Sequence, residues 1–178
     1  MVTIRRANPG DAVFIAETYR PFVDAHYVSF ELTAPNADEI ARRIEAAGNL
    51  YPWLIAEDDQ PLAYAYASPH RTRPAYLTSV DVAIYAADNA RGQGVSKRLY
   101  ARLFEILTAQ NYVMAFAGIV TPNDASIGVH KSLGFELVGT YPNVGFKDGA
   151  WRDTTWWGKR LAEPTTPPAK IRPVSDVI

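Results

Sequence analysis

The N-terminal third of the chain changes from a strand-like to a helix-like hydrophobic pattern. Residues 2–7 alternate apolar and polar side chains, which predicts a strand. Asn8 has the character of a helix N-cap, and the apolar positions after it recur at helical spacing. We expect Pro21 to bend or end this first helix, because proline cannot donate the backbone hydrogen bond of a helix interior. A second helix is predicted to begin at Asn36 and to stop at Gly48.

The rest of the chain predicts six more strands and two more helices. The strands are expected at 51–57, 62–68, 75–86, 112–120, 135–141 and 152–161, and the helices at 94–110 and 121–134. This order predicts an α/β (α+β) domain with a mixed sheet and helices on both faces. We expect residues 142–151 to form a glycine-rich loop. Residues 162–178 contain four prolines and are expected to form an extended tail without a core of its own, after a domain of residues 1–161.

Composition and charge narrow the possible functions. The formal net charge of −1 over 178 residues disfavours nucleic acid or an anionic membrane as partner. Cysteine is absent, which excludes disulfides, thiolate metal sites and a cysteine nucleophile. The N-terminus lacks a signal-peptide core, so we expect a cytoplasmic soluble protein. The separation of His26, His70 and His130 argues against a metal site, and we interpret the first two as loop residues, with His70 near the substrate entrance.

A glycine-containing loop at the start of the third predicted helix is a candidate anion site. It consists of Arg91, Gly92, Gln93, Gly94, Val95 and Ser96. Unpaired N–H groups and the helix dipole favour an anion at such a junction. Lys97 stands where a dinucleotide fingerprint needs glycine, and it also lies too far from Gly94 for a Walker A loop. An ordinary glycine-rich turn with a helix cap is the alternative.

The same loop resembles the R/Q-x-x-G-x-G/A motif of the GCN5-related N-acetyltransferases (GNAT), with serine at the last small position. Four further segments resemble the phosphinothricin acetyltransferase and L-amino-acid N-acyltransferase branch of that superfamily. They are residues 51–57, 73–85, 122–135 and 145–157. The likeness extends over about residues 2–161. It implies a mostly antiparallel sheet of about seven strands, acetyl-CoA as co-substrate and no metal.

The resemblance also implies a cofactor site. The loop from Arg91 to Ser96 would hold the diphosphate of acetyl-CoA, together with Asn123, which also caps a helix. In this fold the strand before the loop diverges from its neighbour. The backbone N–H groups of Ile84, Tyr85 and Ala86 would then polarise the thioester carbonyl beside that gap.

Asp81 is the candidate general base, because it is a carboxylate in an otherwise apolar predicted strand. The family has glutamate here, so the shorter aspartate favours a water between it and the amine. The alternatives are an outward-facing carboxylate, or one paired with the nearby Arg71 or Arg73. His130 is expected to hold coenzyme A or to protonate the thiolate, and the alternative is a histidine that only packs.

The substrate implied by the resemblance is a small amino acid analogue of the phosphinothricin or methionine sulfoximine type. Arg71 and Arg73 are candidates to bind its carboxylate, unless they are solvated surface residues. Phe30, Tyr76 and Val82 are expected to line its pocket. Acetylation of a peptide or protein N-terminus is a competing function, and a non-catalytic acyl-CoA-binding module is another. The tryptophan-rich C-terminal segment is expected to form a homodimer surface, as in relatives.

Overall fold

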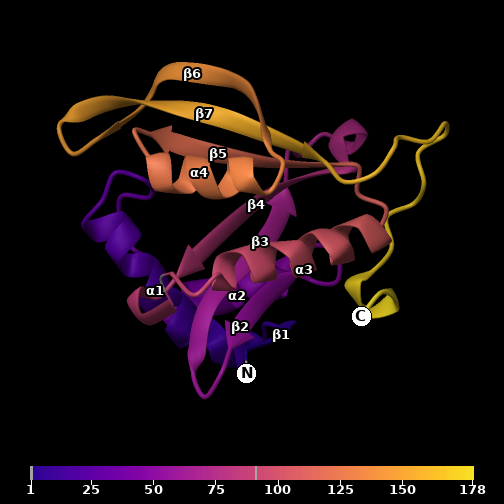
Figure 1. The fold of residues 1–178 in the computed structure, drawn as a ribbon, viewed down its shortest axis with the longest axis horizontal. Coiled ribbons are helices and arrows are strands. Elements are labelled where there is room, and N and C mark those ends of the chain that lie inside the picture. Colours follow the sequence, from indigo (N-terminus) through magenta and orange to yellow (C-terminus); the bar gives the residue numbers. More distant parts are fainter. Residues whose placement is uncertain (1, 91) are drawn as a thin grey trace.

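The computed structural model describes residues 2–90 and 92–178, which form one seven-stranded sheet with four α-helices (Figure 1). The strands are β1 (Thr3–Arg6), β2 (Trp53–Glu57), β3 (Pro61–Pro69), β4 (Ser79–Ala86), β5 (Met114–Thr121), β6 (Glu136–Lys147) and β7 (Ala150–Arg160). The helices are α1 (Ala12–Asp24), α2 (Ala37–Ala47), α3 (Val95–Ala109) and α4 (Asp124–Ser132). The predicted element order and mixed sheet are confirmed. None of the described helices has the length and apolar character needed to cross a bilayer.

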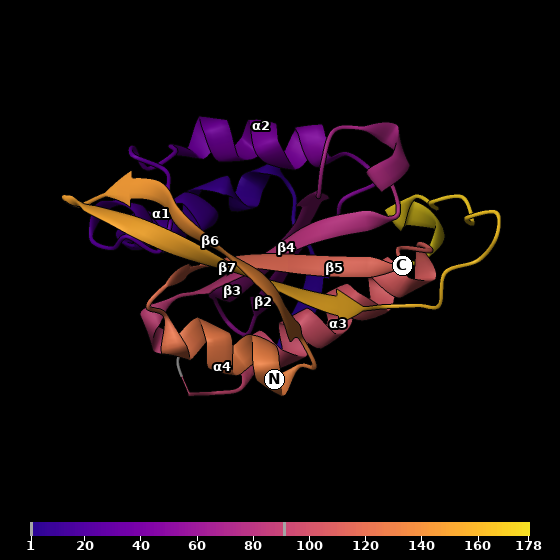
Figure 2. The same ribbon diagram turned by 90° about the horizontal axis from the view of Figure 1, so that it is seen from above.

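Each face of the sheet is covered by a pair of helices, α1 and α2 on one side and α3 and α4 on the other (Figure 2). On the first face, Ile15 of α1 and Ile40 of α2 belong to the same buried cluster as Tyr64 of β3. On the second face, Leu99 of α3 is buried in one cluster with Val80 of β4. The helical spacing of apolar residues therefore produces two separate cores, one on each side of the sheet.

Helix caps occur where the sequence predicts them. The Asn36 side chain accepts a hydrogen bond from Glu39 N at 2.9 Å, at the start of α2. The Asn123 side chain accepts one from Ser126 N at 3.1 Å, at the start of α4. Each cap satisfies an N–H group that the first helical turn leaves unpaired.

The strand order is β1-β2-β3-β4-β5-β7-β6, and the β4–β5 pair is the parallel one. Its register covers only Ser79↔Met114, Val80↔Ala115 and Asp81↔Phe116. Both strands continue for five more residues, to Ala86 and Thr121, without pairing to each other. The two central strands therefore diverge directly after Asp81.

Three predictions about element boundaries are wrong. Pro21 does not end α1, which continues to Asp24, because proline in the last turn costs a single internal hydrogen bond. The strand expected at 75–86 begins at Ser79, after a short 3₁₀ turn. Most of the expected loop 142–151 is strand, with a register shift between Tyr141 and Gly145. Proline and glycine are accommodated there because β6 is an edge strand.

The C-terminal segment runs along the domain and adds a side chain to its core. Val174 is fully buried in the cluster that contains the α3 residues. Its N–H donates to Asn49 O at 2.6 Å. Gln110, at the end of α3, donates to Arg172 O at 2.9 Å. These contacts attach the proline-rich segment to the connection between α2 and β2 and to the end of α3.

Candidate active site

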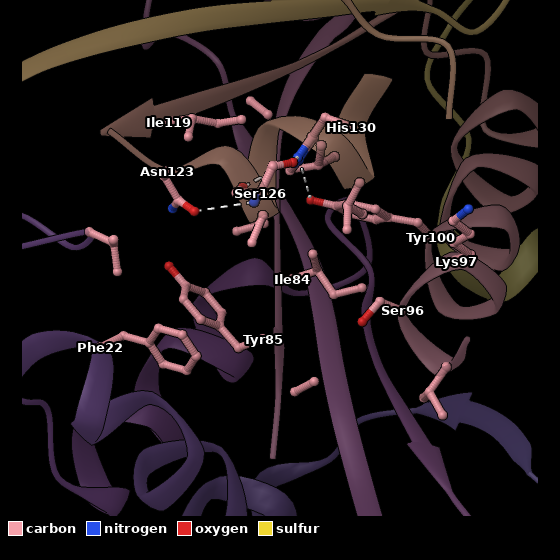
Figure 3. Close-up of a pocket in the computed structure, with 18 of the residues that line it drawn as sticks. Phe22, Ile84, Tyr85, Ser96, Lys97, Tyr100, Ile119, Asn123, Ser126 and His130 are labelled. Carbon is pink, nitrogen blue, oxygen red and sulfur yellow. Dashed lines mark hydrogen bonds between the residues drawn. The ribbon is translucent and has the colours of Figure 1, made fainter. Parts of the chain in front are cut away.

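A cavity of about 730 Å³ opens where β4 and β5 diverge (Figure 3). Its walls come from the second halves of β4 and β5, the start of α3, and α4. Phe22, His26 and Val28 close it on the α1 side. Because β4 and β5 separate after three residue pairs, an opening remains between them in the sheet, and the helices on either side do not fill it.

The start of α3 presents backbone N–H groups to this cavity. Gly92 and Gly94 have φ values of 77° and 70°, a left-handed conformation that favours glycine. Apart from their chain neighbours, no described residue has an atom within 4 Å of where a Cβ would stand on either glycine. No side chain caps α3, so the N–H groups of its first turn face outward. The helix dipole adds positive potential, which suits a diphosphate.

The predicted loop residues do not all line the cavity. Gly92, Gly94, Val95 and Ser96 do, and Lys97 joins them. Gln93 does not line it; its side-chain amide donates to Asn89 O at 2.7 Å. Arg91 lies outside the described residues.

His130 lies in the cavity wall with both ring nitrogens engaged. Nδ1 is 2.8 Å from Ser126 O, and Nε2 is 3.2 Å from the Tyr100 hydroxyl. Because a carbonyl only accepts, Nδ1 carries the proton and Tyr100 donates to Nε2 (Figure 3). Burial lowers the pKa of His130, whose ring is 4% exposed, so the neutral form is favoured. In this form His130 has no unpaired N–H to donate.

The free edge of β4 also contributes to the cavity. Ala87 N donates to Leu62 O of β3 at 2.9 Å. Because N–H directions alternate along a strand, the N–H groups of Ile84 and Ala86 point away from β3, toward the gap. The same alternation turns the N–H of Tyr85 toward β3, so Tyr85 contributes its side chain to the wall instead.

Asp81 lies at the point where the strands part, and its partner is a histidine. Its Oδ1 is 2.6 Å from Nδ1 of His70, which directly follows β3. Burial raises the pKa of Asp81, while the hydrogen bond and charge of His70 and the charge of Arg71 act in the opposite direction. Asp81 is therefore neither outward-facing nor bonded to an arginine. The sequence alone does not pair His70 with Asp81, since only the β3–β4 register brings the two residues together.

The five predicted substrate residues occupy different places. Val82 lines the cavity, and Tyr76 lies beside His70 with ring centroids 6.0 Å apart. Arg71 donates to His70 O at 2.6 Å, and its guanidinium lies 5.4 Å from the Trp156 ring centre. Arg73 is exposed and does not line the cavity. Phe30 does not line it either and packs against Gly145 of β6.

A buried lysine that the sequence did not single out holds the loop between α1 and α2. Lys147, at the end of β6, donates from Nζ to Val23 O, Ser29 O and Glu31 O at 2.6, 2.8 and 2.9 Å. This loop supplies part of the cavity wall. Its position therefore depends on an ammonium group that is distant in sequence.

The sequence matches the acetyltransferase (GNAT) domain family over residues 4–156. A phosphinothricin N-acetyltransferase of Streptomyces coelicolor is 45% identical over 175 residues, covering 90% of this chain and 96% of that protein. An L-methionine sulfoximine/L-methionine sulfone acetyltransferase of Salmonella typhimurium is 30% identical, covering 94% and 99%. The solved structure of a phosphinothricin acetyltransferase from Sinorhizobium meliloti in complex with acetyl-CoA has a TM-score of 0.87 at 37% identity, covering 96% of this chain and 93% of that one.

The cavity fits acetyl-CoA, because the glycine turn and the uncapped start of α3 lie at its edge. The gap between β4 and β5 extends from there toward the carboxylate of Asp81. Among the described residues, no group of three or more metal-ligating side chains could hold an ion. The match covers most of the chain, and the fold agrees with that of a relative solved with acetyl-CoA. The chain therefore belongs to the GNAT family and is an acetyl-CoA-dependent N-acetyltransferase.

Proposed function

We propose that this enzyme acetylates the α-amino group of small amino acid analogues of the phosphinothricin and methionine sulfoximine type. The observation that carries this proposal is the position of Asp81, which does not itself line the cavity but lies where β4 and β5 part, directly before the cavity-lining Val82. In the centre of the described sheet, β4 and β5 are the neighbouring strands that separate, and the Asp81 carboxylate lies where the separation begins. Relatives that cover nearly the whole chain are named for these two substrates.

The cofactor would be held by backbone groups. Val95, Ser96 and Lys97 would donate N–H groups to the diphosphate at the start of α3, and the loop from Arg91 to Gly94 would complete the cradle. The N–H groups of Ile84 and Ala86 would polarise the thioester carbonyl. Preorganised donors of this kind stabilise the oxyanion because they need not reorient during the reaction.

The chemistry requires the substrate ammonium to lose a proton before its nitrogen attacks the acetyl carbon. Asp81 supplies the negative charge that draws this proton away. His130 and Asn123 contribute to the wall of the cofactor pocket. His130 is proposed to shape that wall rather than to donate a proton, since both its ring nitrogens are already hydrogen-bonded.

The amino acid would approach from the face of the sheet that carries α1 and α2. Asp81, Phe116 and Trp156 share this face, since they follow the alternation and register of β4, β5 and β7. The charge of Arg71 acts on Asp81 and its guanidinium lies over Trp156, so Arg71 is a better candidate than Arg73 to bind the substrate carboxylate. Arg73, Tyr76 and Phe30 would form the outer part of this pocket, whereas Val82 lies on the opposite face of β4 and lines the cofactor cavity.

We also propose that the enzyme is a homodimer and works in the cytoplasm. Nine of the twelve residues of the edge strand β6 are exposed. Its exposed apolar side chains, together with one from β7, are Leu137, Val138, Tyr141, Val144, Phe146 and Trp151. An apolar edge strand is an exposed pairing surface, and a second copy of the chain would cover it. Val144→Asp should convert the dimer to a monomer in light scattering, and a monomeric wild type would contradict the proposal.

The activity is tested by following free thiol from acetyl-CoA with a panel of amines. The panel contains phosphinothricin, methionine sulfoximine, methionine sulfone, the standard amino acids and short peptides. We expect thiol release with the small analogues. Release with peptides alone would replace this substrate class by peptide N-termini. Tight binding of acetyl-CoA with no release for any amine would point to a non-catalytic binding module.

A further inference from the structure

His70 is held in one orientation beside Asp81 by three aromatic rings. Its imidazole stacks on Phe116, with ring centroids 4.5 Å apart and planes 27° apart. Tyr76 and Trp156 meet it edge-on at 6.0 and 5.9 Å. Phe116 is the β5 partner of Asp81 in the last β4–β5 register, so the imidazole lies over the point where the strands part.

The hydrogen bond to Asp81 decides which ring nitrogen is free. An ionised carboxylate only accepts hydrogen bonds, so Nδ1 of His70 carries the proton and donates it to Oδ1 across 2.6 Å. Nε2 therefore keeps its lone pair, on the side of the ring away from Asp81. It hydrogen-bonds to no residue in the described parts of the chain. His130 is the opposite case, because Tyr100 occupies its Nε2.

The imidazole also compensates for the short side chain of Asp81. Aspartate places its carboxylate one methylene closer to the strand than glutamate would. With His70 hydrogen-bonded to Asp81, the basic atom is Nε2 of His70, which lies farther from the strand than the carboxylate by the width of the imidazole ring. The charged and titratable groups facing this ring are Asp81 from β4, Tyr76 from the 3₁₀ turn before β4, and Arg71, whose guanidinium lies over Trp156.

We propose that Nε2 of His70 is the atom that takes the proton from the substrate ammonium, and that Asp81 orients the ring and stabilises the imidazolium. This inference rests on the acetyltransferase function proposed above. The pairing follows the general logic of a histidine base held by a carboxylate. His70 is thus a catalytic residue, and Asp81 acts on the substrate through it.

The protons balance without a further reactant. One ammonium proton moves to Nε2, directly or through one water, and leaves an amine with a free electron pair. That pair forms the C–N bond to the acetyl carbon, and the C–S bond breaks with its electrons going to sulfur. The nitrogen loses a second proton as the C–S bond breaks, and this proton ends on the thiolate. The products are the N-acetylated amino acid, free coenzyme A and an imidazolium that later releases its proton to solvent.

Two substitutions separate a catalytic from a positioning role. In His70→Asn the amide nitrogen stands close to the place of Nδ1 and keeps the hydrogen bond to Asp81, but no base remains. In His70→Gln the amide reaches toward the place of Nε2 and the bond to Asp81 is lost. We measure kcat and KM with the best amine of the panel, the Kd of acetyl-CoA by calorimetry, and the pH profile of kcat/KM for wild type and both variants.

We expect both variants to lose about 10²–10⁴-fold in kcat, the usual contribution of a general base, with acetyl-CoA affinity within about twofold of wild type. We also expect the acid limb of the pH profile to move in His70→Asn, since the essential base has changed. A His70→Asn enzyme within about tenfold of wild-type kcat would overturn the inference, and so would an unshifted acid limb. If wild type itself releases no thiol with any amine, the proposed function fails first, so the two failures are distinguishable.

Discussion

Replacing Lys147 by methionine tests how the wall of the active site is held in place. Lys147 is 6% exposed, and its ammonium donates to Val23 O in the last turn of α1 and to Ser29 O and Glu31 O in the loop that follows, at 2.6 to 2.9 Å. Methionine has nearly the same length and preserves the apolar packing of the stem, but it cannot donate. The change therefore removes the hydrogen bonds and leaves three carbonyls to find new partners.

The expected cost follows from these contacts. Hydrogen bonds to a charged group contribute about 1.5–3 kcal/mol each, and the three share one donor, so they do not add fully. Removing a buried ammonium returns part of this free energy, because its desolvation no longer opposes folding. We expect Lys147→Met to lower the free energy of unfolding by about 3 kcal/mol. For a chain of this size the melting temperature should fall by about 6–12 °C.

Urea and thermal unfolding of wild type and variant measure this difference directly. Lys170→Met is the matched control, because Lys170 is exposed in the C-terminal segment, and its stability should stay within about 0.5 kcal/mol of wild type. We also expect the KM of the amine to rise more than the Kd of acetyl-CoA. A loss of stability below about 1 kcal/mol would refute the claim that this ammonium holds the loop.

Three further predictions concern the site. Asp81→Asn should reduce kcat/KM by about 10²–10⁴-fold while acetyl-CoA still binds in calorimetry, and an unchanged rate would remove Asp81 from the mechanism. Gly94→Ala should weaken acetyl-CoA binding and lower the free energy of unfolding by about 1–2 kcal/mol, because φ is 70° at this residue. The control Gly128→Ala, inside α4, should be neutral or stabilising, and equal behaviour of the two variants would contradict this reasoning. The free energy of unfolding of the wild type should contain a contribution from His130 that decreases as the pH falls below about 6.5. Burial lowers the pKa of His130 in the folded protein, so the unfolded chain binds the proton more readily. Urea unfolding of wild type and His130→Gln at several pH values measures this contribution, which the variant should lack. The same pH dependence in both proteins would contradict the prediction.

Local features of the fold and the site could be predicted from the sequence. The caps at Asn36 and Asn123 depend on a side chain and an N–H group three residues later, so a short stretch of sequence contains both partners. The glycine turn before α3 is equally local, because it needs only residues that adopt positive φ next to a helix start. The Asn123 cap and the glycine turn lie in the wall of the cavity that the structure shows.

Features that depend on neighbouring strands could not be predicted in this way. Nothing in residues 142–151 shows that β7 will pair with them, yet that pairing converts a proline- and glycine-containing stretch into strand. Lys147 has an unremarkable sequence context, and its three acceptors lie more than 100 residues away. Pro21 has the local signal of a helix end, but packing of α1 on the sheet carries the helix one turn further.

The sequence by itself therefore determined the order of elements, the helix starts and the kind of group that could bind a diphosphate. Only the tertiary structure decided where β4 leaves β5 and which side chain meets Asp81. The physical reason is that caps and turns are governed by contacts within a few residues. The pairing of His70 with Asp81 depends on strand register and on the aromatic rings of β5 and β7, which come from distant parts of the chain.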